Sequence, residues 1–550
     1  MTTEVERAGL TPPRLIERAR LITLSLGWTA ATLVAIYIGI ALWQVGSIIE
    51  VASWNADNAN MLNMSKELGS LRPSEVVNMG NAPNYTTLWF NAGLHTLGSG
   101  TLIEVAPLLW YVLAATLLIW SVWRVAGRPT AMTAAVLLIC LSPVSLLLTT
   151  SHAVHGPTWF TVAMLGAYAV FVATTARGRS AIAIGLLAGA VAGANVASDP
   201  LAAPTAVVPL LLALSGVWLS SPTMRRSLQR QVGFFLGSVI VSDVIASGIG
   251  TRSGIGSDLP PGKLATVGQM WASFLQSIEN AGQFFGPAPF GGSLSAFAAL
   301  QLLVGIAGIA GVAVAVRAAW RSIPLRRQVD AETPMLQSRR ALSLYWGATL
   351  AVGGAVVLTS PLAFEVRESS LRYEFNLFLA GAVALPVWLH SRGNIGRTLA
   401  SILAIAVAVV GIGGLLEKRA DGSAFLRSAM VVDGSRAIDY ARARGATRGY
   451  AGYWNASGLT WKTGHRIVPV ANCATPSGDT LCISPFAVPP HLMRPVPRTK
   501  SFILVDHTYP GAPEDRFLKG FGPWDEQLAI GSVFIAIYPY DIASRFGPVA

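Results

Sequence analysis

The sequence predicts a mainly α-helical, polytopic membrane protein with about eleven transmembrane helices and a small α/β domain at its C-terminal end. Of its 550 residues, 52% are hydrophobic and 12% are charged, whereas soluble domains carry about 25% charged residues. Apolar runs of about 20 residues recur up to residue 416, and that length lets a helix cross a bilayer. From residue 417 onward, short helix and strand patterns replace these runs.

Each apolar run is a candidate membrane span. The runs between residues 150 and 220 follow one another closely, so a merged or re-entrant segment in that region stays open. The candidates are residues 21–48, 103–123, 130–150, 158–176, 180–197, 202–220, 231–250, 293–316, 341–361, 373–390 and 398–416.

Basic residues predict the orientation. Lys and Arg are concentrated in alternate loops, and such loops normally lie in the cytoplasm. This rule places the N-terminal residues 1–20 inside the cell, a membrane domain over 21–416, and an extracytoplasmic domain over 417–550. We therefore predict a plasma (inner) membrane protein whose dispersed net charge of +12 reports topology rather than nucleic-acid binding. The basic residues assigned to the cytoplasmic side include Arg317, Arg321, Arg339, Arg340 and Arg392.

Two outer loops, residues 49–102 and 251–292, are long. They contain the stretches "NANMLNMSKELGSL", "NYTTLWFNAGLHTLGSG" and "KLATVGQMWASFLQSIENAGQFFG". Apolar residues recur at helical spacing in each stretch, but none is long and apolar enough to span a bilayer. We predict amphipathic helices that lie at the membrane interface and cover a cavity.

The C-terminal region combines an amphipathic helix pattern, "GSRAIDYARARG", with four β-type runs, "TRGYAGYW", "HRIVPVA", "SFILVDH" and "SVFIAIYPY". Cys473 and Cys482 lie close together in this region, and we expect a disulfide between them if the region is exported. Cys140 lies inside an apolar run and is expected to serve packing.

An acid follows the first predicted span. In "SWNADNANM", residues 53–61, Asp57 stands between Asn55 and Asn58. One interpretation is a helix cap, since Asp and Asn accept hydrogen bonds from the first turn of a helix. The other is a general base that takes a proton from an acceptor hydroxyl at the membrane surface. In that case Asn55 and Asn58 are candidates for lining the same cavity.

A basic and aromatic pair precedes the tenth predicted span, in "RESSLRYEF". Arg372 and Tyr373, with Arg367 as a further candidate, are predicted to bind a phosphate. A guanidinium stays protonated and binds two oxygens at once, which suits a phosphodiester. The alternative is an anchor at the membrane boundary, where Arg and Tyr are common.

Four further residues are candidates for lining this cavity. His152 and His155 in "SHAVHGPTWF" are spaced for metal binding, but with no acid beside them a cavity or turn role is favoured. Asp199 either caps the sixth span or faces the cavity, and Lys263 lies on the second outer loop. No cofactor is firmly implied by the sequence, and a divalent metal stays open as an alternative without support from it.

These features together resemble the GT-C superfamily of membrane glycosyltransferases, which includes the protein O-mannosyltransferases and the bacterial aminoarabinose transferase. In that superfamily the first span leads into an outer loop with an acid near its start, and an Arg-Tyr pair enters a late span. Asp57 and the pair Arg372–Tyr373 match by position. Family-39-like enzymes carry a second acid where this chain has Asn58, which argues against a paired-acid metal site.

The resemblance implies an inverting glycosyltransferase of cell-envelope glycan or glycolipid assembly. Its donor would be a polyprenyl-phosphate-linked sugar, and its acceptor a hydroxyl of a glycan, lipid or protein on the outer face. The chain has no GxxxxGK[ST], HExxH or GxSxG motif. A transporter or flippase of lipid-linked sugars and a non-catalytic membrane scaffold are the alternatives. Asp243, within the seventh predicted span, is the residue that a transporter would use.

Overall fold

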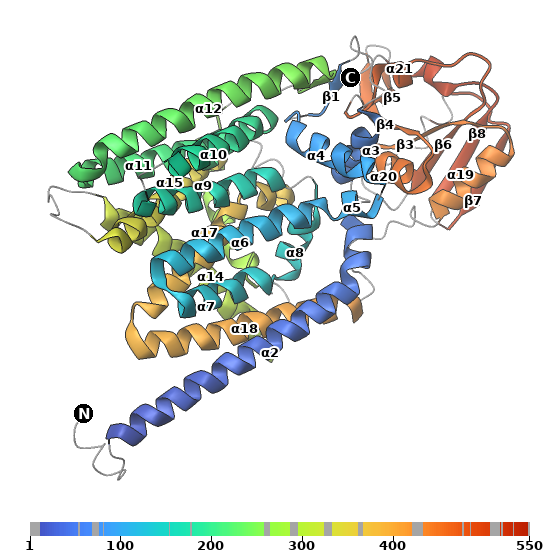
Figure 1. The fold of residues 1–550 in the computed structure, drawn as a ribbon. Coiled ribbons are helices and arrows are strands. Elements are labelled where there is room, and N and C mark those ends of the chain that lie inside the picture. The colour runs from blue at the N-terminus through green and yellow to red at the C-terminus, as the bar shows by residue number, and fades with distance from the viewer. Residues whose placement is uncertain are drawn as a thin grey trace.

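A helical bundle lies beside a mixed α/β part in the computed structural model (Figure 1). The described residues are 12–52, 56–68, 76–80, 82–98, 100–152, 155–175, 179–257, 264–286, 295–323, 333–360, 367–420, 433–475, 478–484, 486–506, 518, 521–531 and 533–547.

The bundle confirms the predicted fold class of a multi-pass membrane protein. Among the described residues, nine helices are long and apolar enough to cross a membrane, and a bent helix pair makes a tenth candidate. The shorter apolar helix α17 (Phe375–His390) corresponds to the remaining predicted span. The other helices are α2 (Pro12–Ala52), α6 (Ala106–Ala126), α9 (Gly156–Thr175), α10 (Arg179–Ser198), α11 (Val208–Ser220) preceded by η1 (Ala203–Val207), α12 (Arg225–Arg252) preceded by η2 (Pro222–Met224), α14 (Ala296–Ser322), α15 (Pro334–Thr359) and α18 (Gly393–Ala420).

One predicted span is not a continuous helix. Residues 130–150 form α7 (Arg128–Ile139) and α8 (Pro143–Thr150), which meet at an angle of 79°. Pro143 cannot donate a backbone hydrogen bond to the preceding turn, and the Ser142 hydroxyl caps the new helix by accepting from the Ser145 N–H at 3.2 Å. The closely spaced runs that follow are separate helices, α9, α10 and α11.

The outer segments contain the predicted helices. They are α3 (Ala56–Glu67), α4 (Tyr85–Thr96), the short α5 (Gly100–Glu104) and α13 (Val267–Gln283). Between them, β1 (Val77–Asn78) pairs in parallel with β2 (Ile255–Gly256). The two long outer loops are thus joined to each other.

The two kinds of outer helix differ in burial. α13 exposes Trp271, Phe274 and Ile278 on one face, as an interfacial helix does. The prediction of an amphipathic helix at the membrane interface is wrong for α3, because its residues 58–65 are all buried. The sequence could not show that a helix from the other end of the chain, α20 (Tyr453–Thr463), packs on α3.

The C-terminal part is built on a six-stranded sheet of order β5-β4-β3-β6-β8-β7. β3 lies in its middle and runs parallel to β4 and β6, whereas the outer pairings are antiparallel. The four predicted strands are present as β3, β4, β6 and β8. The remaining two strands of the sheet, β5 and β7, were not predicted. The elements are α19 (Asp433–Ala443), β3 (Arg448–Gly452), β4 (Ile467–Thr475), β5 (Gly478–Ile483), α21 (Pro490–Met493), β6 (Ser501–Asp506), β7 (Glu526–Ile530), β8 (Val533–Tyr538) and η5 (Ile542–Arg545).

The cysteines behave as expected. A disulfide joins Cys473 on β4 to Cys482 on β5, with Cα atoms 5.9 Å apart. The disulfide therefore links the edge strand β5 covalently to its neighbour β4. Cys140 is a buried free thiol.

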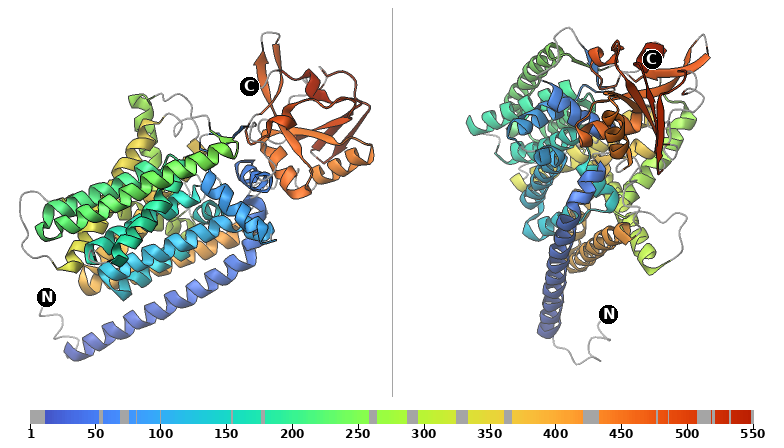
Figure 2. Two further views of the ribbon diagram at one scale, coloured as in Figure 1. Left: turned by 45° about the horizontal axis from the view of Figure 1, so that its top comes forward. Right: turned by 90° about the vertical axis from the view of Figure 1, so that its right-hand side faces the viewer.

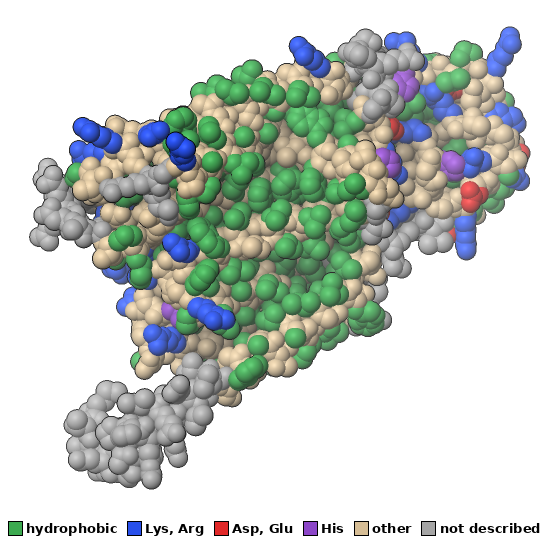
Figure 3. Space-filling view, in the orientation of Figure 1, with side chains coloured by type: hydrophobic (Ala, Val, Ile, Leu, Met, Phe, Trp, Pro, Cys, Tyr) green, Lys and Arg blue, Asp and Glu red, His purple; other side chains and the backbone are tan. Residues whose placement is uncertain are grey.

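The α/β part sits at one end of the bundle, and the N-terminal end of α2 lies at the other (Figure 2). Polar contacts fix this junction to the outer segments. The indole N–H of Trp461 donates to Glu104 at 2.7 Å, and Arg466 pairs with Glu67 at 2.9 Å. Hydrophobic side chains cover the middle of the bundle, and Lys and Arg gather at the end away from the α/β part (Figure 3).

Candidate active site

A pocket of about 460 Å³ lies where the outer segments meet the α/β part. Asp57 comes from α3, and Arg372 and Tyr373 come from the short helix η3 (Arg367–Tyr373). Tyr453, at the start of α20, and His155, before α9, also line the pocket. The predicted base Asp57 and two of the predicted phosphate ligands, Arg372 and Tyr373, therefore share one cavity.

Asp57 lies in the first turn of α3, where the helix dipole favours a negative charge. One carboxylate oxygen lies 3.1 Å from Nη1 of Arg372. The other accepts a hydrogen bond of 2.9 Å from the Tyr453 hydroxyl. The carboxylate of Asp57 thus connects three elements: α3, the short helix η3 that carries Arg372, and α20 of the C-terminal part.

Arg372 contributes a positive charge to the pocket wall. Burial opposes its charge, but Tyr373 and Asp57 outweigh burial, so the pKa of the guanidinium is raised. Its Nε N–H is buried and has no hydrogen-bond partner among the described residues. Buried donors are normally satisfied, so this N–H is unusual. The guanidinium lies 5.0 Å from the ring of Tyr373.

The segment that carries Arg372 is held by a buried acid that the sequence analysis missed. Glu374 is 4% exposed, and burial raises the pKa of its carboxyl group. It accepts hydrogen bonds from the Ser277 hydroxyl and, at 2.5 Å, from the Asn280 amide of α13. Asn280 also donates to the Ser370 hydroxyl at 3.1 Å. α13 therefore fixes the position of η3.

The C-terminal part contributes a second group that the sequence did not reveal as a partner of Asp57. Burial and the nearby Asp57 raise the pKa of the Tyr453 hydroxyl, so it remains a proton donor. It also accepts a hydrogen bond of 3.2 Å from the Asn60 amide. The Ser457 hydroxyl donates to Asn60 at 2.5 Å. No local motif records these pairs, because about 400 residues separate their members.

His155 and Asp199 form a pair at the edge of the pocket. Nδ1 of His155 lies 2.7 Å from Asp199, and the Thr158 hydroxyl donates to the same carboxylate at 2.5 Å. Burial raises the pKa of Asp199, but these hydrogen bonds and that from the Leu201 N–H lower it more. The Leu201 contact is 3.1 Å long and lies in the turn before η1, whose N-cap position is Ala202 and has no side-chain cap. His155 lies 5.2 Å from the ring of Tyr373.

Asp199 is not among the residues that line the pocket, and two further predicted cavity residues also lie away from its wall. His152 is buried, and its Nδ1 lies 3.3 Å from the amide nitrogen of Asn91. Asn58 is buried and accepts a 2.7 Å hydrogen bond from the Ser151 hydroxyl. Both hold the outer helices to the turn before α9, and the pocket lining includes neither.

The remaining predicted positions, Asn55, Lys263 and the side chain of Arg367, lie outside the described residues. In the part of the chain that the structure describes, no group of three or more His, Cys, Asp or Glu side chains is suited to holding a metal ion.

The buried histidine gives a pH-dependent stability. Burial lowers the pKa of His152 to about 4, from a usual 6.5. Between these values the unfolded chain binds a proton that the folded chain does not bind. The contribution of His152 to the free energy of unfolding is therefore fully present above pH 6.5. It is lost from pH 6.5 towards pH 4, by up to about 1.4 kcal/mol per pH unit. Thermal unfolding of the detergent-purified protein at stepped pH measures this slope.

His152→Gln should flatten that slope, whereas His95→Gln, on the exposed end of α4, should leave it unchanged. An equal slope in the His152 variant and the unchanged chain would show that other groups cause the acid sensitivity.

No protein-family model and no curated protein matches the sequence. The chain is similar to two crystal structures of the oligosaccharyltransferase of Archaeoglobus fulgidus. The complex with zinc and sulfate has 13% identity and a TM-score of 0.40, with 75% of this chain and 58% of that chain covered. The apo form has 14% identity and a TM-score of 0.41, with 80% and 64% covered. The match thus spans less than two thirds of the archaeal chain.

Proposed function

We propose that this protein is a membrane glycosyltransferase of the GT-C type. It transfers a sugar from a polyprenyl-phosphate donor to an acceptor hydroxyl, with inversion at the anomeric carbon, in cell-envelope glycan or glycolipid assembly. The observation that carries the proposal is the contact between Asp57 and Arg372 on the wall of one pocket. A base for the acceptor and a cation for the leaving phosphate are thus within reach of a single sugar.

Arg372 has the donors that the leaving phosphate needs. The guanidinium carries five N–H donors, so it binds a phosphate oxygen while Nη1 remains near Asp57. As the bond between the anomeric carbon and the phosphate oxygen breaks, negative charge grows on the phosphate, and the guanidinium stabilises that charge. Tyr373 lies beside it on the same wall.

Asp57 acts on the acceptor. Arg372 and Tyr453 donate to its carboxylate, and an acceptor hydroxyl takes the place of one of these donors. The carboxylate removes the hydroxyl proton as the oxygen attacks the anomeric carbon from the face opposite the phosphate. Because Tyr453 belongs to α20, the C-terminal part helps to place the acceptor.

The donor arrives by way of the membrane. The pocket lies at the end of the bundle beside the α/β part, level with the start of α17. A lipid tail then runs between apolar helices while its phosphate meets Arg372. The distribution of basic residues supports an extracytoplasmic position for this end, and an activated lipid-linked sugar there needs no nucleotide-binding motif.

A transporter of lipid-linked sugars is the second candidate. Such proteins place ionisable groups within the membrane. Asp243 of α12 is such a group and is half-buried. The acidic and basic residues that converge on one pocket, however, are at the end of the bundle, which favours interfacial chemistry.

The deciding experiment uses the full chain in liposomes. Radiolabelled polyprenyl-phosphate sugars and nucleotide sugars are offered with glycan, lipid and peptide acceptors. We expect transfer from at least one lipid-linked donor and none from a nucleotide sugar. Flux of a lipid-linked sugar without transfer would establish the transporter, and transfer from a nucleotide sugar would refute the proposed donor class.

A further inference from the structure

A second cavity lies at the opposite end of the bundle from the candidate active site. Its volume is about 510 Å³, and its walls come from α6, α14, α15 and α17. α17 begins directly after Glu374 and ends at His390, beside this cavity. Its 16 residues span about 24 Å at the helical rise of ~1.5 Å per residue. The two cavities are therefore separate sites.

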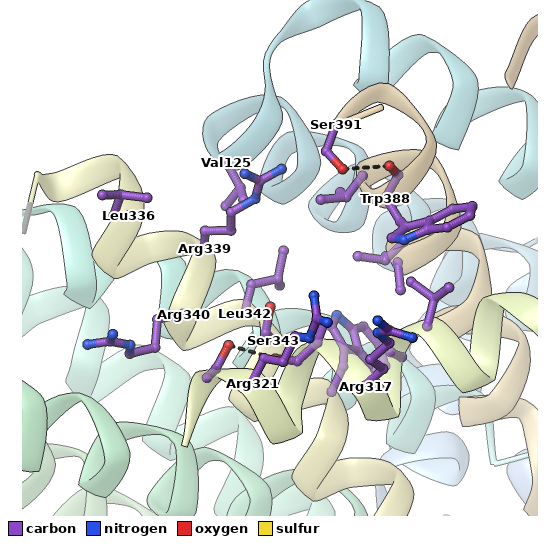
Figure 4. Close-up of a pocket in the computed structure, with 18 of the residues that line it drawn as sticks. Val125, Arg317, Arg321, Leu336, Arg339, Arg340, Leu342, Ser343, Trp388 and Ser391 are labelled. Atoms are coloured by element: carbon purple, nitrogen blue, oxygen red, sulfur yellow. Dashed lines mark hydrogen bonds between the residues drawn. The ribbon is translucent and has the colours of Figure 1, made fainter. Parts of the chain in front are cut away.

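Arginines surround this cavity, which we name the arginine pocket. Arg317 and Arg321 stand one turn apart near the C-terminal end of α14, so they share a face. Figure 4 shows both on one side of the pocket and Arg339 of α15 on the other, whereas Arg340 points away from the shared space. Arg392, after α17, also lines the pocket. The topology rule places these residues at this end, but it does not require them to converge on a cavity.

No acid among the described residues neutralises Arg317, Arg321 or Arg339 of this pocket. Among the described residues that line it, none is acidic. Arg317, Arg321 and Arg339 form no ion pair with a described acid. Like charges around one cavity repel each other, and a bound anion removes that repulsion. The planar, forked guanidinium is suited to the oxygens of a phosphate.

The pocket wall contains a further unsatisfied donor. Trp346 of α15 is 2% exposed, and its indole N–H has no hydrogen-bond partner among the described residues. A buried donor without a partner is unusual in a folded protein.

The position and lining of the pocket indicate an amphiphile. The arginines stand at the ends of apolar, membrane-length helices, at the level where lipid headgroups lie. Apolar side chains accompany them on the lining, and two of these, Leu336 and Trp388, are exposed at its edge. A free phosphate would use only the arginines, whereas a phospholipid would also cover these apolar groups.

We propose that the arginine pocket binds the phosphate-bearing headgroup of an anionic membrane phospholipid. The headgroup phosphate lies among Arg317, Arg321 and Arg339, and the acyl chains follow the apolar surface of the adjoining helices. The site is independent of the transfer reaction, because α17 separates it from Asp57 and Arg372.

The test titrates phosphatidylglycerol and phosphatidylcholine into the detergent-purified full chain and counts bound lipids by native mass spectrometry. The pocket variant is a double substitution, Arg317→Gln together with Arg339→Gln. Its matched control pairs Arg124→Gln with Arg226→Gln, two exposed arginines at the same end of the bundle that do not line the pocket. We expect the pocket variant to lose about tenfold or more in affinity for phosphatidylglycerol, and the control to stay within about twofold.

Each other outcome overturns the proposal. Equal losses in both variants would show that only general surface charge attracts the lipid. Equal binding of the two lipids, with saturable binding of added inorganic phosphate, would assign the pocket to a soluble phosphate. If the arginine variant aggregates, Ser343→Trp fills the cavity with the arginines kept, and unchanged binding of phosphatidylglycerol by that variant would refute the site.

Discussion

Replacing Asp57 by asparagine is expected to lower kcat for sugar transfer by about 10² to 10⁴-fold, the range associated with loss of a general base. The asparagine oxygen still accepts the hydrogen bond from Tyr453, but the side chain no longer takes a proton. The measurement is initial transfer from a radiolabelled polyprenyl-phosphate sugar by the purified chain in liposomes.

The same substitution separates the two interpretations of Asp57. Asparagine caps a helix about as well as aspartate does, so a residue that only caps α3 would tolerate it. Loss of transfer with an unchanged melting temperature therefore supports the base. Asp439→Asn, at an exposed position of α19, is the control and should transfer normally. Full transfer by the Asp57 variant would remove the proposed base.

Replacing Arg372 by glutamine is expected to lower kcat/KM for the lipid-linked donor by about 10² to 10³-fold, as removal of a donor to developing negative charge does. The substitution removes the guanidinium that faces the pocket and the ion pair with Asp57. Steady-state kinetics with the donor varied at saturating acceptor measure the effect.

Arg372→Lys sharpens this test because it keeps the charge and loses the two-pronged geometry. We expect it to recover only part of the lost kcat/KM. Arg252→Gln, at the exposed C-terminal end of α12, is the control and should behave as the unchanged chain does. If the glutamine variant of Arg372 bound and used the donor normally, the leaving phosphate would have to be held elsewhere.

Much of the fold followed from local physical patterns. A run of about 20 apolar residues has few stable arrangements other than a membrane helix, because its backbone must satisfy its own hydrogen bonds. The predicted spans accordingly match helices of the structure, apart from the bend at Pro143. The burial of α3 did not follow, since its polar sequence is explained only by α20, which packs on it.

The candidate site shows the same division. Asp57, Arg372 and Tyr373 were each found from their type and place beside a span, because the end of a membrane helix fixes where such residues lie. Glu374 looked like one more charge at a boundary, although its carboxylate holds η3 to α13. The role of Tyr453 depends on a contact with Asp57 that closes only when the two ends of the chain meet.

The sequence by itself determined the membrane class of the chain, the number and order of its apolar segments, and which residue types stand at the membrane surface. These depend on transfer free energies of short segments, which need no partner. Only the tertiary structure decided that Asp57 touches Arg372, that His155 is held by Asp199, and that separate arginines enclose one pocket. Such contacts join residues that are distant in the chain, and their energies exist only after the helices have packed.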